Sequence, residues 1–490
     1  MHSIHKTIKK YNHLPVQLKA AFWFLICSFL QKGISMLTTP IFTRMLTTAE
    51  YGQYNVFNSW LGIIGIFVTL RISYGVFSQG LVKFEQDRNV FCSSLQGLAT
   101  TLVLFWTVIY LLFRNFWNGV FSLSTVQMLC ILLLTWCSTA FECWAAEQRV
   151  EYKYRMLVIV TLLVSVIKPL IGIVFVALAN DKVTARILGL VLVELVGYVG
   201  LFASQVKRGK RIYSGKYWKY ALAFNIPLVP HYLSQVVLSS SDRIMISSMV
   251  GDSQAGIYSL AYSLSSIMQL FNTALMQTIS PWIYQKIKDQ KIKEIEPIAY
   301  ISIAFIAAVN LLLILFAPEA VAIFAPKTYR EAIYVIPPVA MSVFFMYSYD
   351  LFAKFAFYYE KTQMIMTASC IGAALNVALN YVFIQKYGYV AAGYTTLACY
   401  IIYAIAHYAM MNMVCKKFCG GIKPYKGAYI GGIAILFLVF GFVLLSTYDY
   451  VLIRYGLIVV AIIFTVLNRK KIVGVLAHIA ALKRKVNDKP

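Results

Sequence analysis

The sequence predicts an all-α polytopic membrane protein with about 14 transmembrane helices. These helices form two pseudo-symmetric six-helix lobes around a central cavity, plus two C-terminal helices. The chain of 490 residues is 60% hydrophobic and 13% charged, and its mean hydropathy is +0.71, which is far from the balance of a soluble protein. Its apolar runs are about 20 residues long, enough for a membrane helix and about twice the length of a barrel strand. An internal repeat divides the chain into halves.

Charged residues and turns separate the spans. Those of the first half are expected near 16–40, 53–76, 92–113, 121–146, 156–179 and 183–206. Those of the second half are expected near 220–246, 255–282, 297–323, 333–358, 364–384 and 389–414, and two more near 427–446 and 451–468. The predicted domains are an N-terminal tail (1–15), an N-lobe (16–206), a basic loop (207–219), a C-lobe (220–414), a loop (415–426), the last two spans (427–468) and a basic tail (469–490).

The basic residues predict the orientation of these spans. An even number of spans places both ends of the chain on one side of the membrane. About 30 of the 44 Lys and Arg residues fall in the tails and in alternate connections, which places the termini and those connections in the cytoplasm. The formal net charge of +25 is therefore explained by topology and by anionic lipid head groups, and we expect no binding of nucleic acid.

Two sequence offsets indicate the repeat. When the chain is compared with itself at an offset of 204 residues, Gly52 aligns with Gly256 and Tyr54 with Tyr258. At 208 residues, the run 155–175 aligns with 363–383, and Glu142 aligns with Asp350. Because six spans are an even number, both halves enter from the same side, and an axis along the membrane normal should relate them.

No cofactor or metal site is expected. The nine cysteines lie mostly inside apolar runs at spacings that match no zinc or redox pattern, and no Walker A sequence is present.

Three segments resemble the signature of the polysaccharide transporter (Wzx-type oligosaccharide flippase) family, within the multidrug/oligosaccharidyl-lipid/polysaccharide superfamily. They are KGISMLTTPIFTRMLTTAEYGQYNVF (32–57), FNIPLVPHYLSQVVLSSSDRIMISSMVGDSQAGIYSLAYSL (224–264) and ALNYVFIQKYGYVAAGYTT (378–396). The resemblance implies a bacterial inner-membrane transporter without enzyme activity. Its implied substrate is an oligosaccharide linked through a diphosphate to a polyprenol, as in O-antigen, capsule or exopolysaccharide repeat units. It also suggests a polysaccharide polymerase and a chain-length regulator as partners.

Nine of the ionisable residues inside predicted spans are candidates for function, because each costs about 2.5–3.5 kcal/mol unless it faces an interior or a wet cavity. The basic members are expected to bind the anionic head group in a cationic cavity: Lys32, Arg71, Lys168, Arg243 and Lys354. The acidic members are candidates for coupling to H⁺ or Na⁺ or for gating: Glu142, Asp242, Asp350 and Glu194.

Structural roles are the alternatives for several of these residues. Asp350 and Lys354 are four residues apart and can neutralise each other on one helix face. Asp242 and Arg243 are adjacent and cannot pair well, so each needs another partner, either across the two lobes as a gate or in static packing. Lys32, Arg71 and Lys168 have no obvious local acid, which would leave the interior of the first lobe net positive.

The sequence therefore predicts a flippase that works by alternating access. One alternative is a cation-coupled multidrug exporter of the same superfamily, for which an acidic cavity would be expected. The other is a membrane glycosyltransferase or ligase, which the short connections between the spans disfavour.

Overall fold

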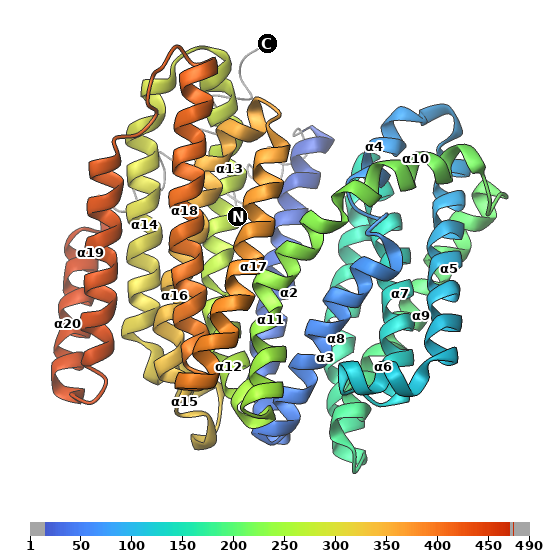
Figure 1. Ribbon diagram of the computed structural model, residues 1–490, viewed down its shortest axis with the longest axis horizontal. Helices are drawn as coiled ribbons and strands as arrows, with labels where there is room; N and C mark the ends of the chain where they lie inside the picture. Colours follow the sequence, from blue (N-terminus) through green and yellow to red (C-terminus); the bar gives the residue numbers. More distant parts are fainter. Residues whose placement is uncertain (1–14, 471–473, 475–490) are drawn as a thin grey trace, which may run out of the picture. The chain divides into compact units, whose positions relative to one another are not determined.

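The computed structural model describes residues 15–470 and 474, and these residues are helical throughout with short turns (Figure 1). The predicted N-terminal tail and most of the C-terminal tail lie outside this part of the chain. The helices group into two compact units, 1–236 and 237–490. The all-α fold class is confirmed.

In the part of the chain that the structure describes, the first unit contains nine α-helices and the short helical turn η1 before η2 and the helix that the two units share. They are α2 (Val16–Met45), α3 (Thr48–Thr69), α4 (Val76–Lys83), η1 (Glu85–Asp87), α5 (Arg88–Leu112), α6 (Arg114–Phe121), α7 (Thr125–Val150), α8 (Tyr154–Leu178), α9 (Lys182–Gly209) and α10 (Gly215–Asn225). The turn η2 (Ile226–Leu228) and helix α11 (Val229–Met249) follow, and the division between the units falls inside α11.

The second unit continues after α11 with helices that end at residue 467. They are α12 (Asp252–Ser265), α13 (Met268–Lys288), η3 (Ile292–Glu294), α14 (Ile295–Leu315), α15 (Ala317–Phe324), η4 (Lys327–Tyr329), α16 (Ala332–Tyr358), α17 (Thr362–Tyr387), α18 (Ala391–Phe418), α19 (Gly427–Ser446) and α20 (Val451–Leu467).

The internal repeat is visible in helix bounds and in packing. Shifted by 208 residues, α7, α8 and α9 fall on α16, α17 and α18 to within one residue at each end. In the first unit α7 packs against α3, α5 and α9, and α8 packs against α9. In the second unit α16 packs against α12, α14 and α18, and α17 packs against α18. Corresponding helices therefore have corresponding neighbours.

Eleven helices of the described residues are long and apolar enough to cross a membrane. The other predicted spans correspond to α3, the α12–α13 pair and α20. Helix α3 carries Gln53, Asn55 and Asn58 in its first half. The α12–α13 pair is interrupted at Ser266 and Ile267, and α20 has only 17 residues. These spans are helical as expected, but they are more polar or shorter than the others.

Several boundaries differ from those predicted. The second span ends at Thr69 rather than near 76, because Leu70 and Arg71 both adopt left-handed backbone conformations (φ 50° and 51°). Asn225 Nδ2 donates to the Leu70 carbonyl at 3.0 Å and holds this break. The seventh span begins earlier, at α10, and is interrupted at η2, where Pro227 lies.

The first unit extends past the loop 207–219, at which the sequence analysis placed its end. Helix α10 packs against α4 and α5, where Tyr217 and Ala221 are buried with Phe91 and Leu95. The Trp218 indole also donates to the Ser94 carbonyl at 2.9 Å. The start of the predicted C-lobe is therefore part of the first compact unit.

Capping boxes fix two of the described helix starts in the first unit. Thr47 and Glu50 form a reciprocal capping box at the start of α3, and Ser124 and Gln127 form another at the start of α7. Each box satisfies backbone amides that the first helical turn leaves without partners.

Candidate functional site

Lys168 of α8 forms a buried ion pair in the first unit. Its Nζ lies 2.5 Å from Glu194 Oε1 on α9, and Ser138 of α7 donates to the other carboxylate oxygen at 3.1 Å. Glu194 is 6% exposed. The expectation that Lys168 has no local acid is therefore wrong: Glu194 is 26 residues away in sequence, but α8 and α9 pack side by side.

Arg71 lies at the left-handed break between α3 and α4 and is half-buried. Its guanidinium lies over two aromatic rings, 5.2 Å from the centre of Tyr74 and 5.6 Å from that of Tyr232. Such cation–π contacts leave the positive charge available to an anion.

Lys32 and Glu142 both have exposed side chains in the first unit. Lys32 is on α2, and Glu142 on α7 accepts a short hydrogen bond from the Ser73 hydroxyl. The ion pairs formed by the described residues include neither Lys32 nor Arg71. The structure therefore brings Lys168 and Glu194 into contact. Among the described residues, neither Lys32 nor Arg71 has an acidic partner.

Asp242 is almost completely buried in α11, with 1% exposure. Its carboxylate accepts hydrogen bonds from Tyr258 Oη at 2.6 Å, Asn380 Nδ2 at 2.6 Å and Thr396 Oγ1 at 3.0 Å. These donors come from α12, α17 and α18 of the second unit, and all are neutral. A membrane-buried carboxyl with oxygen- and amide-bearing neighbours is suited to bind or release a small cation.

Arg243 points away from this cluster. Its Nη1 donates to the carbonyl of Ser239 at 3.1 Å, and its guanidinium lies 4.2 Å from the centre of the Tyr262 ring. As expected for adjacent residues, Asp242 and Arg243 form no ion pair in the described structure. Their described partners lie within the second unit, so the hypothesis of an ion pair between the lobes gains no support from these contacts.

Asp350 and Lys354 form the predicted pair on α16, with Oδ1 and Nζ 2.7 Å apart. Both side chains line a cavity of about 500 Å³ between α13 and α16. They are the only residues among the predicted nine that line this cavity.

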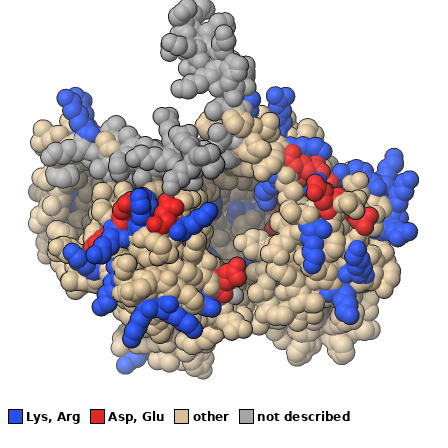
Figure 2. Space-filling view, turned by 90° about the horizontal axis from the view of Figure 1, so that it is seen from above, with Lys and Arg blue, Asp and Glu red and all other residues tan. Residues whose placement is uncertain are grey.

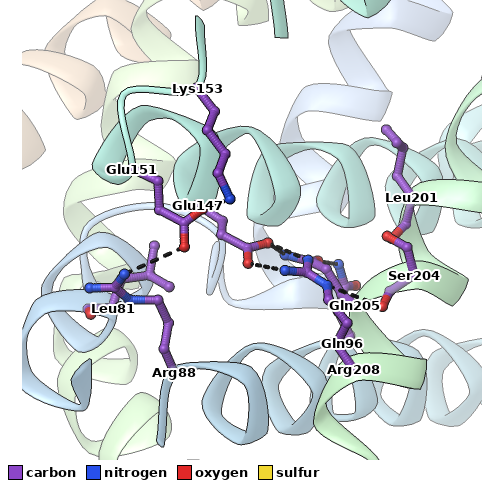
Figure 3. Close-up of polar contacts among 10 residues, drawn as sticks. All are labelled: Leu81, Arg88, Gln96, Glu147, Glu151, Lys153, Leu201, Ser204, Gln205 and Arg208. Carbon is purple, nitrogen blue, oxygen red and sulfur yellow. Dashed lines mark hydrogen bonds and ion pairs between the residues drawn. The ribbon is translucent and has the colours of Figure 1, made fainter. Parts of the chain in front are cut away.

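The sequence analysis missed a buried polar network where α5, α7 and α9 meet (Figure 3). Glu147, with 1% exposure, accepts from both terminal nitrogens of Arg208 at 2.7 and 2.8 Å and from Gln205 Nε2 at 2.7 Å. Gln205 Oε1 in turn accepts from Gln96 at 2.6 Å. Glu147 was placed in a connection because the span was expected to end at 146, whereas α7 continues to Val150.

Glu151 extends this network just beyond the end of α7 (Figure 3). Lys153 Nζ lies 2.6 Å from its carboxylate and Arg88 Nη1 lies 3.4 Å from it. Burial opposes ionisation of Glu151, but the hydrogen bond and charge of Lys153 and the charge of Arg88 outweigh it and lower the pKa of Glu151.

Arg186 of α9 was also missed. Its guanidinium lies 3.7 Å from the centre of the Phe42 ring and 3.5 Å from that of Tyr54. The predicted span began at 183, so Arg186 read as a boundary residue, and only the packing of α2, α3 and α9 reveals its aromatic surroundings.

The basic connections gather at one end within each unit. In the first unit Ser93 donates to the Arg211 carbonyl at 2.7 Å, which joins the start of α5 to the basic loop after α9. In the second unit Tyr300 accepts from the Lys426 amide at 2.8 Å, which joins the start of α14 to the connection after α18. Figure 2, a view from above, shows many Lys and Arg side chains at the surface and fewer Asp and Glu, which lie in a few groups.

No group of three or more His, Cys, Asp or Glu residues that could hold a metal ion occurs among the described residues.

Comparison with solved structures identifies the fold. Lipid II flippase MurJ in an inward closed conformation matches with a TM-score of 0.67 at 15% identity, covering 91% of this chain and 99% of that one. An inward-facing multidrug resistance MATE family transporter matches with a TM-score of 0.61 at 13% identity, covering 79% and 95%. The Vibrio cholerae MATE transporter VcmN matches with a TM-score of 0.54 at 12% identity, covering 85% and 98%.

Comparison with known sequences gives two relatives and a family. The Lsg locus putative protein 1 of Haemophilus influenzae is 24% identical over 206 residues, which are 41% of this chain and 51% of that protein, so the chain spans about half the length of this relative. An uncharacterized membrane protein of the same organism is 18% identical over 72% of this chain and 86% of its own length. The MatE family model matches residues 227–382. The polysaccharide biosynthesis protein family model matches residues 17–287, more than half of the 490 residues, and the chain belongs to this family.

Proposed function

We propose that this protein moves an oligosaccharide linked to a polyprenyl diphosphate from the cytoplasmic leaflet to the outer leaflet of a bacterial inner membrane. The family match supports a role in polysaccharide biosynthesis, and the fold is one that a lipid II flippase also has. The observation that carries the proposal is that Lys32, Arg71 and Arg243 lie in apolar helices or at their breaks. None of the three takes part in an ion pair with another described residue.

These unpaired cations suit an anionic head group. A diphosphate offers several oxygens to ammonium and guanidinium donors, and each charge-assisted hydrogen bond contributes about 1.5–3 kcal/mol. Arg71 and Arg243 contact aromatic rings, and Nη1 of Arg243 also donates to the Ser239 carbonyl. A guanidinium has five N–H donors, which is more than these contacts use.

The membrane potential favours export of such a substrate. Moving one negative charge outward lowers the free energy by about 2.3 kcal/mol per 100 mV. A diphosphate carries about two negative charges, so its export gains roughly twice this amount. For additional coupling to H⁺ or Na⁺, Asp242 is the strongest of the predicted carboxylates, because it is buried without a cationic partner among its described hydrogen bonds, whereas Asp350 and Glu194 are paired with lysines.

We propose alternating access as the mechanism and cytoplasmic positions for the termini. The basic end of each unit would face the cytoplasm, in line with the distribution of Lys and Arg near membrane helices. The polymerase and the chain-length regulator remain proposed partners in the same membrane.

Transport is favoured over catalysis by the short connections. Between α18 and α19 the described chain has only eight residues, 419–426, and no larger connection between helices is found in the part of the chain that the structure describes. Glycosyltransferases and ligases that use such lipids generally present catalytic carboxylates in a larger soluble segment.

A cation-coupled multidrug exporter is the second candidate, favoured by the match of residues 227–382 to the MatE model. A cavity for cationic drugs should present unpaired acids. The exposed Glu142 is the predicted acid that best meets this requirement. The positive charges of Lys32 and Arg71 in the same unit argue against a site for cationic drugs.

Reconstitution into liposomes tests the proposal. The substrate is the lipid-linked oligosaccharide extracted from the host cell, and its arrival in the opposite leaflet is followed with a membrane-impermeant reagent that oxidises sugars. We expect protein-dependent movement that Lys32→Ala slows by raising KM about 10- to 100-fold, the equivalent of one charge-assisted bond. Lys32→Arg should preserve most of the activity.

Lys386→Ala provides the matched control, because Lys386 is an exposed lysine in the last turn of α17. Equal effects of Lys32→Ala and Lys386→Ala would contradict a binding role for Lys32. Movement of a cationic dye, with none of the lipid-linked oligosaccharide, would favour the exporter instead.

A further inference from the structure

The second unit contains a cavity between α13 and α16, with several polar side chains in its wall, that the proposed transport of a charged head group does not explain. Its volume of about 500 Å³ is within the usual range for small-molecule sites, about 300–1,000 Å³. Five polar residues of α13 line it: Gln269, Asn272, Thr273, Gln277 and Ser280.

These five residues lie along one face of the helix, because their spacing of three to four residues matches the helical turn. Amides and hydroxyls inside a membrane protein are costly unless each finds a hydrogen-bond partner. A continuous polar face of this length therefore indicates either a wet cavity or a ligand with many hydroxyl groups.

Asn272 supplies a buried hydrogen-bond acceptor for such a ligand. It is 9% exposed, and its Nδ2 donates to the Val343 carbonyl of α16 at 2.9 Å. Its Oδ1 has no hydrogen-bond partner among the described residues. The hydrogen bond of Nδ2 fixes the orientation of the amide group. Its oxygen is therefore already positioned to accept a hydrogen bond from a ligand.

The charged residues of the cavity give it no net preference for the diphosphate. Its two charged residues, Asp350 and Lys354, neutralise each other at 2.7 Å. A neutral ligand that donates and accepts hydrogen bonds fits this pair, whereas a phosphate would be repelled by the carboxylate.

Tyr349 adds an aromatic surface to the cavity and is half-buried. Its ring packs edge to face against Tyr403, with centroids 4.6 Å apart, which fixes its orientation. Aromatic rings offer an apolar face to the C–H side of a sugar ring, while amides bind its hydroxyls.

We propose that this cavity binds sugar residues of the transported oligosaccharide, apart from the diphosphate. Gln277 and Thr273, whose side chains are exposed in the cavity wall, contact the sugar hydroxyls, and Asn272 Oδ1 accepts from one of them. The inference rests on the proposed function and assigns sugar selectivity to α13 and α16.

Two substrates separate sugar recognition from head-group recognition. One is the complete lipid-linked oligosaccharide from the host cell, and the other is the same polyprenyl diphosphate carrying a single sugar. For Gln277→Leu we expect KM for the complete oligosaccharide to rise about 2- to 10-fold, the equivalent of one neutral hydrogen bond, with kcat unchanged. KM for the single-sugar substrate should stay the same.

Gln285→Leu is the matched control on α13, because Gln285 lies two turns further along and does not line the cavity. Thr273→Val is a second, nearly isosteric test in which the fold is retained. Equal changes for both substrates, or no change for either with Gln277→Leu and Thr273→Val, would overturn the sugar site. If the wild-type protein moves neither substrate, the proposed function itself fails.

Discussion

Replacing Lys168 with methionine asks whether the ion pair in the first unit stabilises the fold or binds substrate. Methionine has a similar length and no charge. After this change the carboxylate of Glu194, which is 6% exposed, keeps only the described hydrogen bond from Ser138. Removing one partner of a buried pair usually costs about 3–5 kcal/mol. Because the Lys168 side chain is 26% exposed and water can reach it, we expect a loss of about 3 kcal/mol.

The double variant Lys168→Met with Glu194→Leu should recover most of this loss. An apolar pair of similar volume often replaces a buried ion pair without net cost, and we expect a free energy of unfolding within about 1 kcal/mol of the wild type. Titration with a denaturing detergent measures these free energies, and the liposome assay measures transport in the same samples.

The combination of stability and transport decides the role of Lys168. If the pair is structural, the double variant is both stable and active. If Lys168 binds the head group, the double variant is stable but inactive. A Lys168→Met protein as stable as the wild type would refute the reasoning, since it would mean that Glu194 does not carry a buried charge that needs Lys168.

Two further predictions concern acids in each unit. Asp242→Asn keeps the shape of the side chain but removes its charge, so the protein should fold and transport should no longer respond to an imposed Na⁺ or H⁺ gradient; a response equal to that of the wild type would remove Asp242 from coupling. Because the pKa of Glu151 is lowered in the folded state, the stability from its contacts with Arg88 and Lys153 is complete above the ordinary pKa of glutamate and is lost as the pH falls through the lowered pKa. Hydrogen exchange of amides 151–153 should show this loss in the wild type and not in Glu151→Gln; identical pH profiles would contradict it.

Most of the fold could be predicted because its signals are local. Helices α7, α8 and α9 begin and end within four residues of their predicted spans, since apolar length and flanking charge set those limits. The break after Thr69 was not predictable, because neither Leu70 nor Arg71 favours a left-handed backbone and a distant side chain, Asn225, helps to hold it.

The candidate site was less predictable, because its contacts join residues far apart in the chain. The pair Asp350–Lys354 was foreseen because its members are four residues apart on one helix. The partner of Lys168 could not be identified until α8 was packed against α9. The neutral donors to Asp242 were missed for the same reason, since Asn380 lies 138 residues away.

Helix α9 has polar contacts along nearly its whole length of about 42 Å. Arg186 lies between aromatic rings near its start, Glu194 is paired at its middle, and Gln205 and Arg208 hold Glu147 near its end. Sliding or rotation of this helix would break all of these contacts together. A spin label at the exposed Val196 would therefore report displacement of the entire first unit rather than a local rearrangement, which makes α9 the natural reference for spectroscopic measurement of the transport cycle.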